Sequence, residues 1–159
     1  MSRTSPRIVL ADPQRSSQRL LRRQLEDAGF HVEIAANGSE VILLCEIDPP
    51  DILILDVDLP DMDGFEVCAY VRHETHDSDI TVIIMTETTD EMTRTYLGQM
   101  VDYAGGDYFF ARPFDGRLLV HLLDGLSNQA DQSNDQPRAV FPTRVVWPTT
   151  RTRSFASIN

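Results

Sequence analysis

Short apolar runs alternate with segments of helical periodicity from Ile8 to Leu126. The apolar runs predict five strands, at residues 8–11, 32–35, 51–56, 80–85 and 108–111. The segments that follow them predict five helices, at residues 16–28, 39–47, 64–72, 90–103 and 115–126. Gly29 is expected to end the first helix, and Ser39 is expected to cap the second helix at its N-terminus.

This alternation of strands and helices indicates an α/β fold, a doubly wound five-stranded parallel sheet with right-handed crossovers and helices on both faces. The third predicted strand is apolar from Ile52 to Leu55, which is typical of a central parallel strand that is buried on both faces. In such sheets the chemistry lies beyond the carboxyl ends of the strands, where the strand order reverses. The functional site is therefore expected at that edge.

Four of the predicted strands end in polar residues that can act together, namely Asp12, Asp56, Thr86 and Arg112. Paired carboxylates can hold a hard divalent cation such as Mg²⁺, with waters and phosphate oxygens as further ligands. A carboxylate beside such a charge can attack a phosphoryl group and become an acyl phosphate. A hydroxyl and a cation nearby can then bind the new phosphoryl oxygens. The four strand ends therefore predict a site for phosphoryl transfer.

Charge and composition divide the 159-residue chain into three parts. Residues 1–6 are expected to form an N-terminal extension, residues 7–126 one domain, and residues 127–159 a flexible polar linker and a tail that contains Arg and Trp. The net charge is −11, and the acidic excess lies before residue 127, because the last 33 residues contain four Arg and two Asp. Within the tail, residues 141–148 are either a segment without structure or a strand that docks on a partner or on the acidic domain.

Composition also excludes several classes of function. An acidic surface repels nucleic acid and anionic membranes, and no apolar run approaches the roughly 20 residues that span a bilayer. Residues 1–7 are polar and lead into too short an apolar run for a secretory signal. Cys45 and Cys68 lie in amphipathic patterns without metal-ligand spacing, so they are expected to be reduced packing residues of a cytoplasmic protein. All 14 basic residues are arginine, and the sequence contains no lysine.

The segment Pro50–Val67, PDILILDVDLPDMDGFEV, strongly resembles the phosphoacceptor segment of bacterial two-component response-regulator receiver domains. The resemblance covers about residues 6–126 and implies the flavodoxin-like (βα)5 receiver fold. It implies that Asp56 accepts a phosphoryl group from a histidine kinase or a phosphotransfer protein in a phosphorelay. It also implies a Mg²⁺ site formed by Asp12, by Asp56 and by the backbone carbonyl of Asp58.

Further positions match the signalling residues of that family. Thr86 matches the switch hydroxyl that follows the phosphoryl group, and Phe109 matches the aromatic rotamer switch. The segment Arg112-Pro113-Phe114 matches the family's Lys-Pro-Phe, in which the peptide bond before proline is cis. The resemblance implies output through protein contacts on the face formed by the fourth helix, fifth strand and fifth helix, and a homodimer is left open. Direct contact with nucleic acid or with a membrane is not expected.

Three residues depart from the family pattern. Pro13 fills the place of the second acidic residue after the first strand, which is usually a direct metal ligand, so Mg²⁺ is expected to bind weakly. Arg112 replaces the family's lysine and is expected to pair with Asp56 or Asp12 in the resting state. Glu87 adds negative charge beside an incoming phosphate. The alternative function is therefore a phosphorylation-independent pseudo-receiver, an interaction module on the same fold.

Two motifs point to enzymes and are set aside. The segment Gly105–Phe109 (GGDYF) is similar to a signature of diguanylate cyclases, but its position matches a glycine-containing loop of receivers, and the chain has no room for a cyclase domain. Asp56-Val57-Asp58 fits the DxD motif of haloacid-dehalogenase phosphatases. Those phosphatases carry Thr or Val where this chain has Pro60, and their downstream segments are missing. The chain is therefore not expected to be an enzyme.

Overall fold

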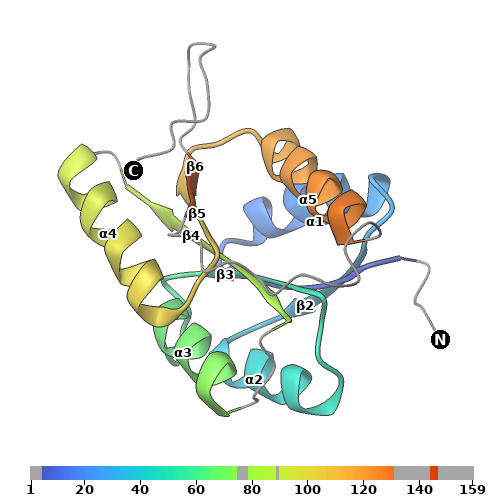
Figure 1. The fold of residues 1–159 in the computed structure, drawn as a ribbon, viewed down its shortest axis with the longest axis horizontal. Coiled ribbons are helices and arrows are strands. Elements are labelled where there is room, and N and C mark those ends of the chain that lie inside the picture. The colour runs from blue at the N-terminus through green and yellow to red at the C-terminus, as the bar shows by residue number, and fades with distance from the viewer. Residues whose placement is uncertain (1–4, 75–78, 89, 131–143, 147–159) are drawn as a thin grey trace.

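The computed structural model describes residues 5–74, 79–88, 90–130 and 144–146, and a parallel β-sheet lies at its centre (Figure 1). The strands lie in the order β2-β1-β3-β4-β5-β6, and their bounds are β1 Arg7–Ala11, β2 His31–Ala35, β3 Ile52–Asp56, β4 Thr81–Glu87, β5 Tyr108–Arg112 and β6 Arg144–Val146. The helices are α1 Arg15–Asp27, α2 Gly38–Ile47, α3 Gly64–Glu74, α4 Glu91–Ala104 and α5 Gly116–Ala130. The predicted architecture of five parallel strands and five helices is confirmed, and a sixth strand lies beside it.

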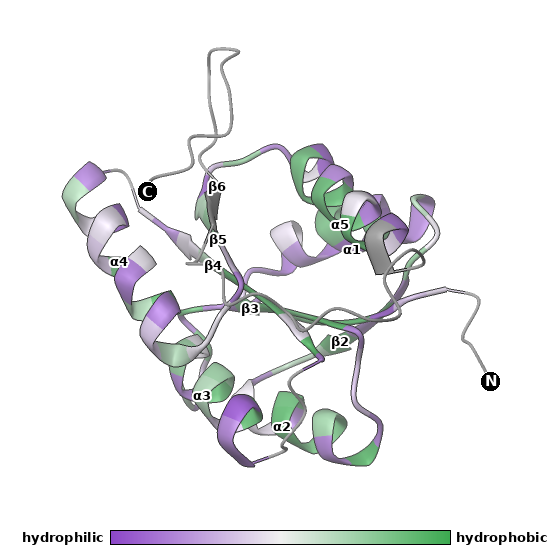
Figure 2. Ribbon diagram, in the orientation of Figure 1, coloured by the Kyte–Doolittle hydropathy of each residue, from purple (hydrophilic) through white to green (hydrophobic). Residues whose placement is uncertain are grey.

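The helices cover both faces of the sheet, with α1 and α5 on one face and α2, α3 and α4 on the other (Figure 1). Successive strand residues point to opposite faces, so Leu53 packs toward α2–α4 and Ile54 packs toward α1 and α5. Both residues are fully buried, and no residue of β1 or β3 is more than 8% exposed. Figure 2 shows the resulting apolar character of the central strands. Among the described residues, no helix is long and apolar enough to cross a membrane.

The predicted cap of α2 is wrong, because Asn37 rather than Ser39 caps this helix. The Asn37 side chain accepts a hydrogen bond from the Glu40 backbone N–H at 2.8 Å, and the Glu40 carboxylate accepts one from the Ala36 N–H at 2.6 Å. This reciprocal arrangement satisfies one N–H of the first turn and the N–H of the residue before the cap. The backbone N–H and the hydroxyl of Ser39 bind Asp61 instead, in the loop after β3. Because Ser39 is engaged by Asp61, a residue distant in the sequence, Asn37 serves as the cap of α2.

Residues beyond the predicted domain boundary at residue 126 form regular structure. Helix α5 continues to Ala130, and Arg144–Val146 form β6, which pairs in parallel with β5. In that pairing Phe109 stands opposite Val145, so β6 covers the edge that β5 would otherwise leave open. The rest of the segment 141–148 lies outside the described residues. The division of the chain into a domain and a tail stays a prediction.

The loop between α4 and β5 has the form of a helix end. Gly105 takes a left-handed conformation with φ of 86° and ends α4, and its carbonyl accepts a hydrogen bond from Arg72 at 2.8 Å. Arg72 also pairs with Asp107 at 2.6 Å. The glycine pair in GGDYF therefore serves a turn that α3 holds in place.

The sixth strand leads to a testable prediction for β5. A chain ended after Ala130 should exchange the β5 amides that face β6 faster than a chain ended after Val146, because only the longer chain retains the strand that covers them. Hydrogen exchange of Tyr108–Phe110, followed by mass spectrometry or NMR, measures the difference. Equal exchange in the two chains would show that β6 does not protect this edge.

Candidate functional site

The carboxyl ends of β1, β3, β4 and β5 lie side by side at one edge of the sheet, and each brings a polar residue to it. Asp12 follows β1, Asp56 ends β3, Thr86 lies near the end of β4, and Arg112 ends β5. All four are buried, with exposed fractions of 4% for Asp12, 3% for Asp56, 4% for Thr86 and 9% for Arg112. The peptide bond from Arg112 to Pro113 is cis, as the resemblance to receiver domains implies. The structure therefore brings the four predicted residues to one buried edge, at the point where the strand order reverses.

Arg112 bridges the two carboxylates with separate nitrogens of its guanidinium group. Its Nη1 donates to Asp56 Oδ2 at 2.7 Å, and its Nη2 donates to Asp12 Oδ2 at 2.5 Å. The predicted pairing with one of these acids is confirmed, and the structure shows both pairs at once. Charge-assisted hydrogen bonds are short and strong, and they strengthen where water is excluded. The guanidinium thus ties the ends of β1, β3 and β5 together.

The second oxygen of each carboxylate accepts a hydrogen bond from the backbone two residues further on. The Gln14 N–H donates to Asp12 Oδ1 at 2.8 Å, and the Asp58 N–H donates to Asp56 Oδ1 at 2.8 Å. These are Asx turns, which aspartate forms readily at the end of a strand. All four oxygens of the two buried carboxylates therefore have a donor.

Burial is the main influence on the ionisation of Asp56. Removal from water raises the pKa of this carboxyl above its ordinary value of 3.8. The Asp58 N–H and the positive charge of Arg112 oppose that effect, whereas the negative charge of Asp12 adds to it. The pKa is raised in the balance of these effects. Asp56 is thus a carboxylate held in a low-dielectric site, with a neighbouring cation that favours its charged form.

A glycine allows the loop after β3 to fold back against the end of that strand. The Gly64 N–H donates to the Val57 carbonyl at 3.0 Å, which closes the loop. A Cβ at Gly64 would lie 2.5 Å from the backbone oxygen of Asp56, closer than real Cβ atoms come to backbone. A larger residue would therefore push the loop away from Asp56 and disturb the Asp58 N–H that binds it.

Thr86 and Phe109 lie on the same face of the sheet. Strand pairing sets Phe109 opposite Ile84, and Thr86 is two residues further along β4, so alternation points Thr86 and Ile84 to the same side. The Phe109 ring is completely buried among the residues that face α2–α4. In this structure, the residue that matches the family's aromatic switch therefore occupies an inward position.

One residue of the site, Gln14, was not among the residues predicted from the sequence. Gln14 serves Asp12 through its backbone, and its side-chain nitrogen donates to Glu87 Oε2 at 3.3 Å, which links the loop after β1 to the end of β4. The position of Gln14 two residues after an aspartate is the signal that could have identified it, because that spacing is typical of an Asx turn.

Comparison with known proteins identifies the family. The profile of the response regulator receiver domain matches residues 8–124, which is most of the chain. This chain belongs to the response regulator receiver domain family. Such domains act in two-component signalling, and their family is a signalling family. The fold and the family thus agree with the resemblance found in the sequence.

Several response regulators are similar to this receiver over nearly its whole length. The chain is 33% identical over 147 residues to the response regulator MprA of Mycobacterium sp. (strain KMS), covering 91% of this chain and 61% of that protein. It is 37% identical to MprA of Mycobacterium avium (strain 104), with 91% and 62% covered. The chain therefore spans about three fifths of the length of these relatives.

Solved structures confirm the fold. The chemotaxis response regulator CheY4 of Vibrio cholerae superposes with a TM-score of 0.68 at 26% identity, covering 77% of this chain and 99% of that one. A CheY-like receiver domain from Methanospirillum hungatei, at 24% identity, has a TM-score of 0.68 and covers 82% of this chain and 100% of that one. The second likeness concerns the fold alone.

The residues of the site do not fit a resident Mg²⁺ ion as they lie. Receiver domains generally bind Mg²⁺ at the phosphorylation site. Here both carboxylates that would bind the ion are engaged by Arg112, and Pro13 offers no side-chain ligand. In the described ranges, no group of three or more His, Cys, Asp or Glu residues could hold a metal. The predicted ligand role of Asp12, Asp56 and the Asp58 carbonyl therefore requires Arg112 to move, and it stays a prediction.

The ion pairs predict how stability depends on Arg112. Arg112→Gln should lower the free energy of unfolding by about 3 kcal/mol at pH 7, because it leaves two carboxylates buried without their cation. The Asp56 pKa should then rise further. A carboxyl whose pKa is raised in the folded state destabilises the fold most at pH values above that pKa. This destabilisation disappears as the pH falls toward the ordinary value of 3.8, so the loss of stability should be smaller at pH 5 than at pH 7.

Urea unfolding of the wild type and the variant at both pH values measures this loss. Adding Asp56→Asn to Arg112→Gln should recover part of the stability at pH 7, because it removes the repulsion between Asp12 and Asp56. A loss that is equal at both pH values, and that Asp56→Asn does not reduce, would contradict this electrostatic account.

Proposed function

We propose that Asp56 is the phosphoacceptor of this receiver. The observation that carries the proposal is the position of Asp56, a buried carboxylate at the end of the central strand β3, held by Arg112 at 2.7 Å. A histidine kinase is the partner that a receiver domain implies. Attack of an Asp56 oxygen on the phosphorus forms an acyl phosphate, and the donor leaves with the electron pair of the broken bond.

Arg112 and Thr86 are proposed to receive the new phosphoryl oxygens. A guanidinium donates to such oxygens in a planar fork, so Arg112 can keep its charge beside the group after transfer. Thr86 is a buried hydroxyl residue on the strand next to β3. A shift of Thr86 toward the phosphoryl group would change the packing around Phe109, because the two residues lie on the same face of paired strands. That coupling is the proposed route from the site to the rest of the domain.

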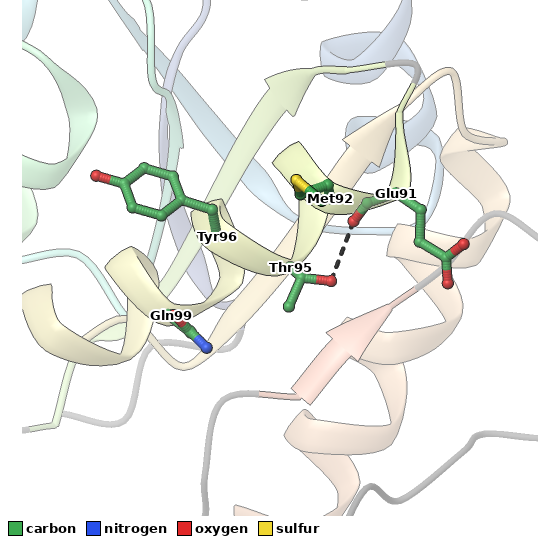
Figure 3. Close-up of a pocket in the computed structure, with 5 residues that line it drawn as sticks. All are labelled: Glu91, Met92, Thr95, Tyr96 and Gln99. Carbon is green, nitrogen blue, oxygen red and sulfur yellow. Dashed lines mark hydrogen bonds between the residues drawn. The ribbon is translucent and has the colours of Figure 1, made fainter.

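The output surface is proposed to be the face formed by α4, β5 and α5. Helix α4 presents exposed Met92, Tyr96 and Tyr103, with exposed fractions of 84%, 61% and 89%. Figure 3 shows Met92 and Tyr96 beside Glu91, Thr95 and Gln99, which together line a pocket on this helix. Large apolar side chains rimmed by polar ones are typical of protein contacts.

The sixth strand changes what that surface offers to a partner. Because β6 pairs with β5 along Tyr108–Phe110, a partner meets β6 rather than the bare edge of β5. The partner is either a downstream protein or a second copy of the chain. The acidic character of the molecule disfavours nucleic acid and anionic membranes. A cytoplasmic location is proposed because Cys45 and Cys68 are buried free thiols, which is typical of a reducing compartment.

A pseudo-receiver is the second candidate function. All four oxygens of Asp12 and Asp56 already accept hydrogen bonds, so the resting site is closed on itself. A receiver that stays in this state would act as an interaction module through its α4 face without accepting a phosphoryl group. The experiment below separates the two functions.

Phosphorylation of Asp56 can be read from the intact mass. Incubation with acetyl phosphate and Mg²⁺ should add one phosphoryl group to the wild type and none to Asp56→Asn. Asp27→Asn is the matched control, because Asp27 is an exposed aspartate at the C-terminal end of α1. We expect this control to be modified like the wild type. An unmodified wild type would favour the pseudo-receiver.

The switch can be followed in an amide NMR spectrum. Beryllofluoride mimics the phosphoryl group on a carboxylate, so its binding should shift the amides of residues 86–112, which join Thr86 to Arg112. Asp56→Asn should show no such shifts. Bound beryllofluoride that perturbs only the neighbours of Asp56, and leaves Phe109 unchanged, would contradict the proposed coupling.

A further inference from the structure

The positive charge between the two carboxylates of the site comes from the protein itself, from the side chain of Arg112. The Arg112 guanidinium lies between Asp12 and Asp56 and contacts both at 2.5 and 2.7 Å. It therefore takes the carboxylate oxygens that a divalent cation would take. Arg112 also stands at the strand end where the family carries lysine. One side chain therefore fills both the place of that lysine and the place of the metal ion.

We propose that Arg112 is the resident cation of this site and that phosphoryl transfer to Asp56 proceeds without a divalent metal. The proposal rests on the proposed function of Asp56 and names the group that supplies its positive charge. Three features carry it, namely the double contact of Arg112, the completed hydrogen bonding of both carboxylates, and the absence of a second acid at Pro13.

A guanidinium has the donors that this task needs. It carries five N–H groups in a plane, and the contacts with Asp12 and Asp56 use two of them. The remaining donors can bind phosphoryl oxygens while the contact with Asp12 holds the group in place. A lysine ammonium is a single point of charge on a flexible stem and does not offer this planar fork.

The transfer step balances without a metal or a proton. An Asp56 oxygen forms a bond to phosphorus, the bond from phosphorus to the donor oxygen of acetyl phosphate breaks, and acetate leaves with the electron pair. The Arg112 guanidinium stays positively charged throughout, as arginine side chains do in proteins. Its Nη1 contact passes from Asp56 Oδ2 to the new phosphoryl oxygens, where the negative charge now lies.

The test compares phosphorylation with Mg²⁺ and with EDTA in the full chain. Wild type incubated with acetyl phosphate should be modified at the same rate in both. Arg112→Lys should be at least about tenfold slower in EDTA than in Mg²⁺, because the ammonium cannot bridge both acids. Arg117→Lys is the matched control, since Arg117 is an exposed arginine of α5, and it should behave as the wild type.

A second readout does not depend on phosphorylation. Calorimetric titration with Mg²⁺ should show no saturable binding to the wild type, and binding should appear in Arg112→Lys combined with Pro13→Asp, which frees the acids and adds a third. Circular dichroism confirms that each variant is folded.

Three results would overturn the proposal. Phosphorylation of the wild type in Mg²⁺ but not in EDTA would overturn the metal-independent step, although Asp56 would remain the phosphoacceptor. If the wild type bound Mg²⁺ saturably and Asp12→Asn abolished this binding, the inference about Arg112 would be overturned, but the proposed function of Asp56 would stand. A wild type that is modified in neither condition would remove the proposed function together with this inference.

Discussion

The bridge from Arg112 to Asp12 and Asp56 is the interaction on which the shape of the site depends. Three charges are buried at the edge of a sheet whose central strand β3 is apolar at every position before Asp56. Removing charges from water costs several kcal/mol for each ion, and apolar residues of similar volume often give equal or greater stability. The bridge is therefore a poor way to stabilise a fold, and chemistry at this edge is the better reason for it.

The surrounding structure makes the bridge specific. Parallel pairing sets the ends of β1, β3 and β5 at one edge, so the three charged residues arrive there without any long loop. The backbone N–H groups of Gln14 and Asp58 orient the two carboxylates, and Gly64 lets the loop after β3 close on Asp56. Each partner is a backbone group or a strand end, so little freedom is left to lose when a phosphoryl group arrives.

The sequence predicted the elements, and the strand ends at which Asp12, Asp56, Thr86 and Arg112 lie, because these signals are local. Apolar runs and helical spacing identify strands and helices, and polar residues at strand ends indicate the edge at which they meet. The cap of α2 was missed because Asp61, distant in the chain, engages Ser39 and leaves Asn37 as the cap. Strand β6 corresponds to the docking strand on the acidic domain, one of the alternatives that the sequence left open for residues 141–148, and three residues of strand carry too little periodic signal to decide between them. The double contact of Arg112 depends on side-chain geometry, which spacing does not reveal.

Strand β5 connects the site to the proposed output surface within five residues. Arg112, at its end, holds both acids, while Phe109 and Phe110 pair with β6 on the outer side and with β4 on the inner side. A backbone shift that accompanies a new contact of Arg112 therefore reaches both neighbouring strands through hydrogen bonds of the same sheet. Packed interiors move between discrete arrangements rather than deforming smoothly, so a small displacement at Arg112 can change the β5–β6 pairing as a unit. The sixth strand therefore belongs to the proposed route, because it pairs with β5 over Tyr108–Phe110.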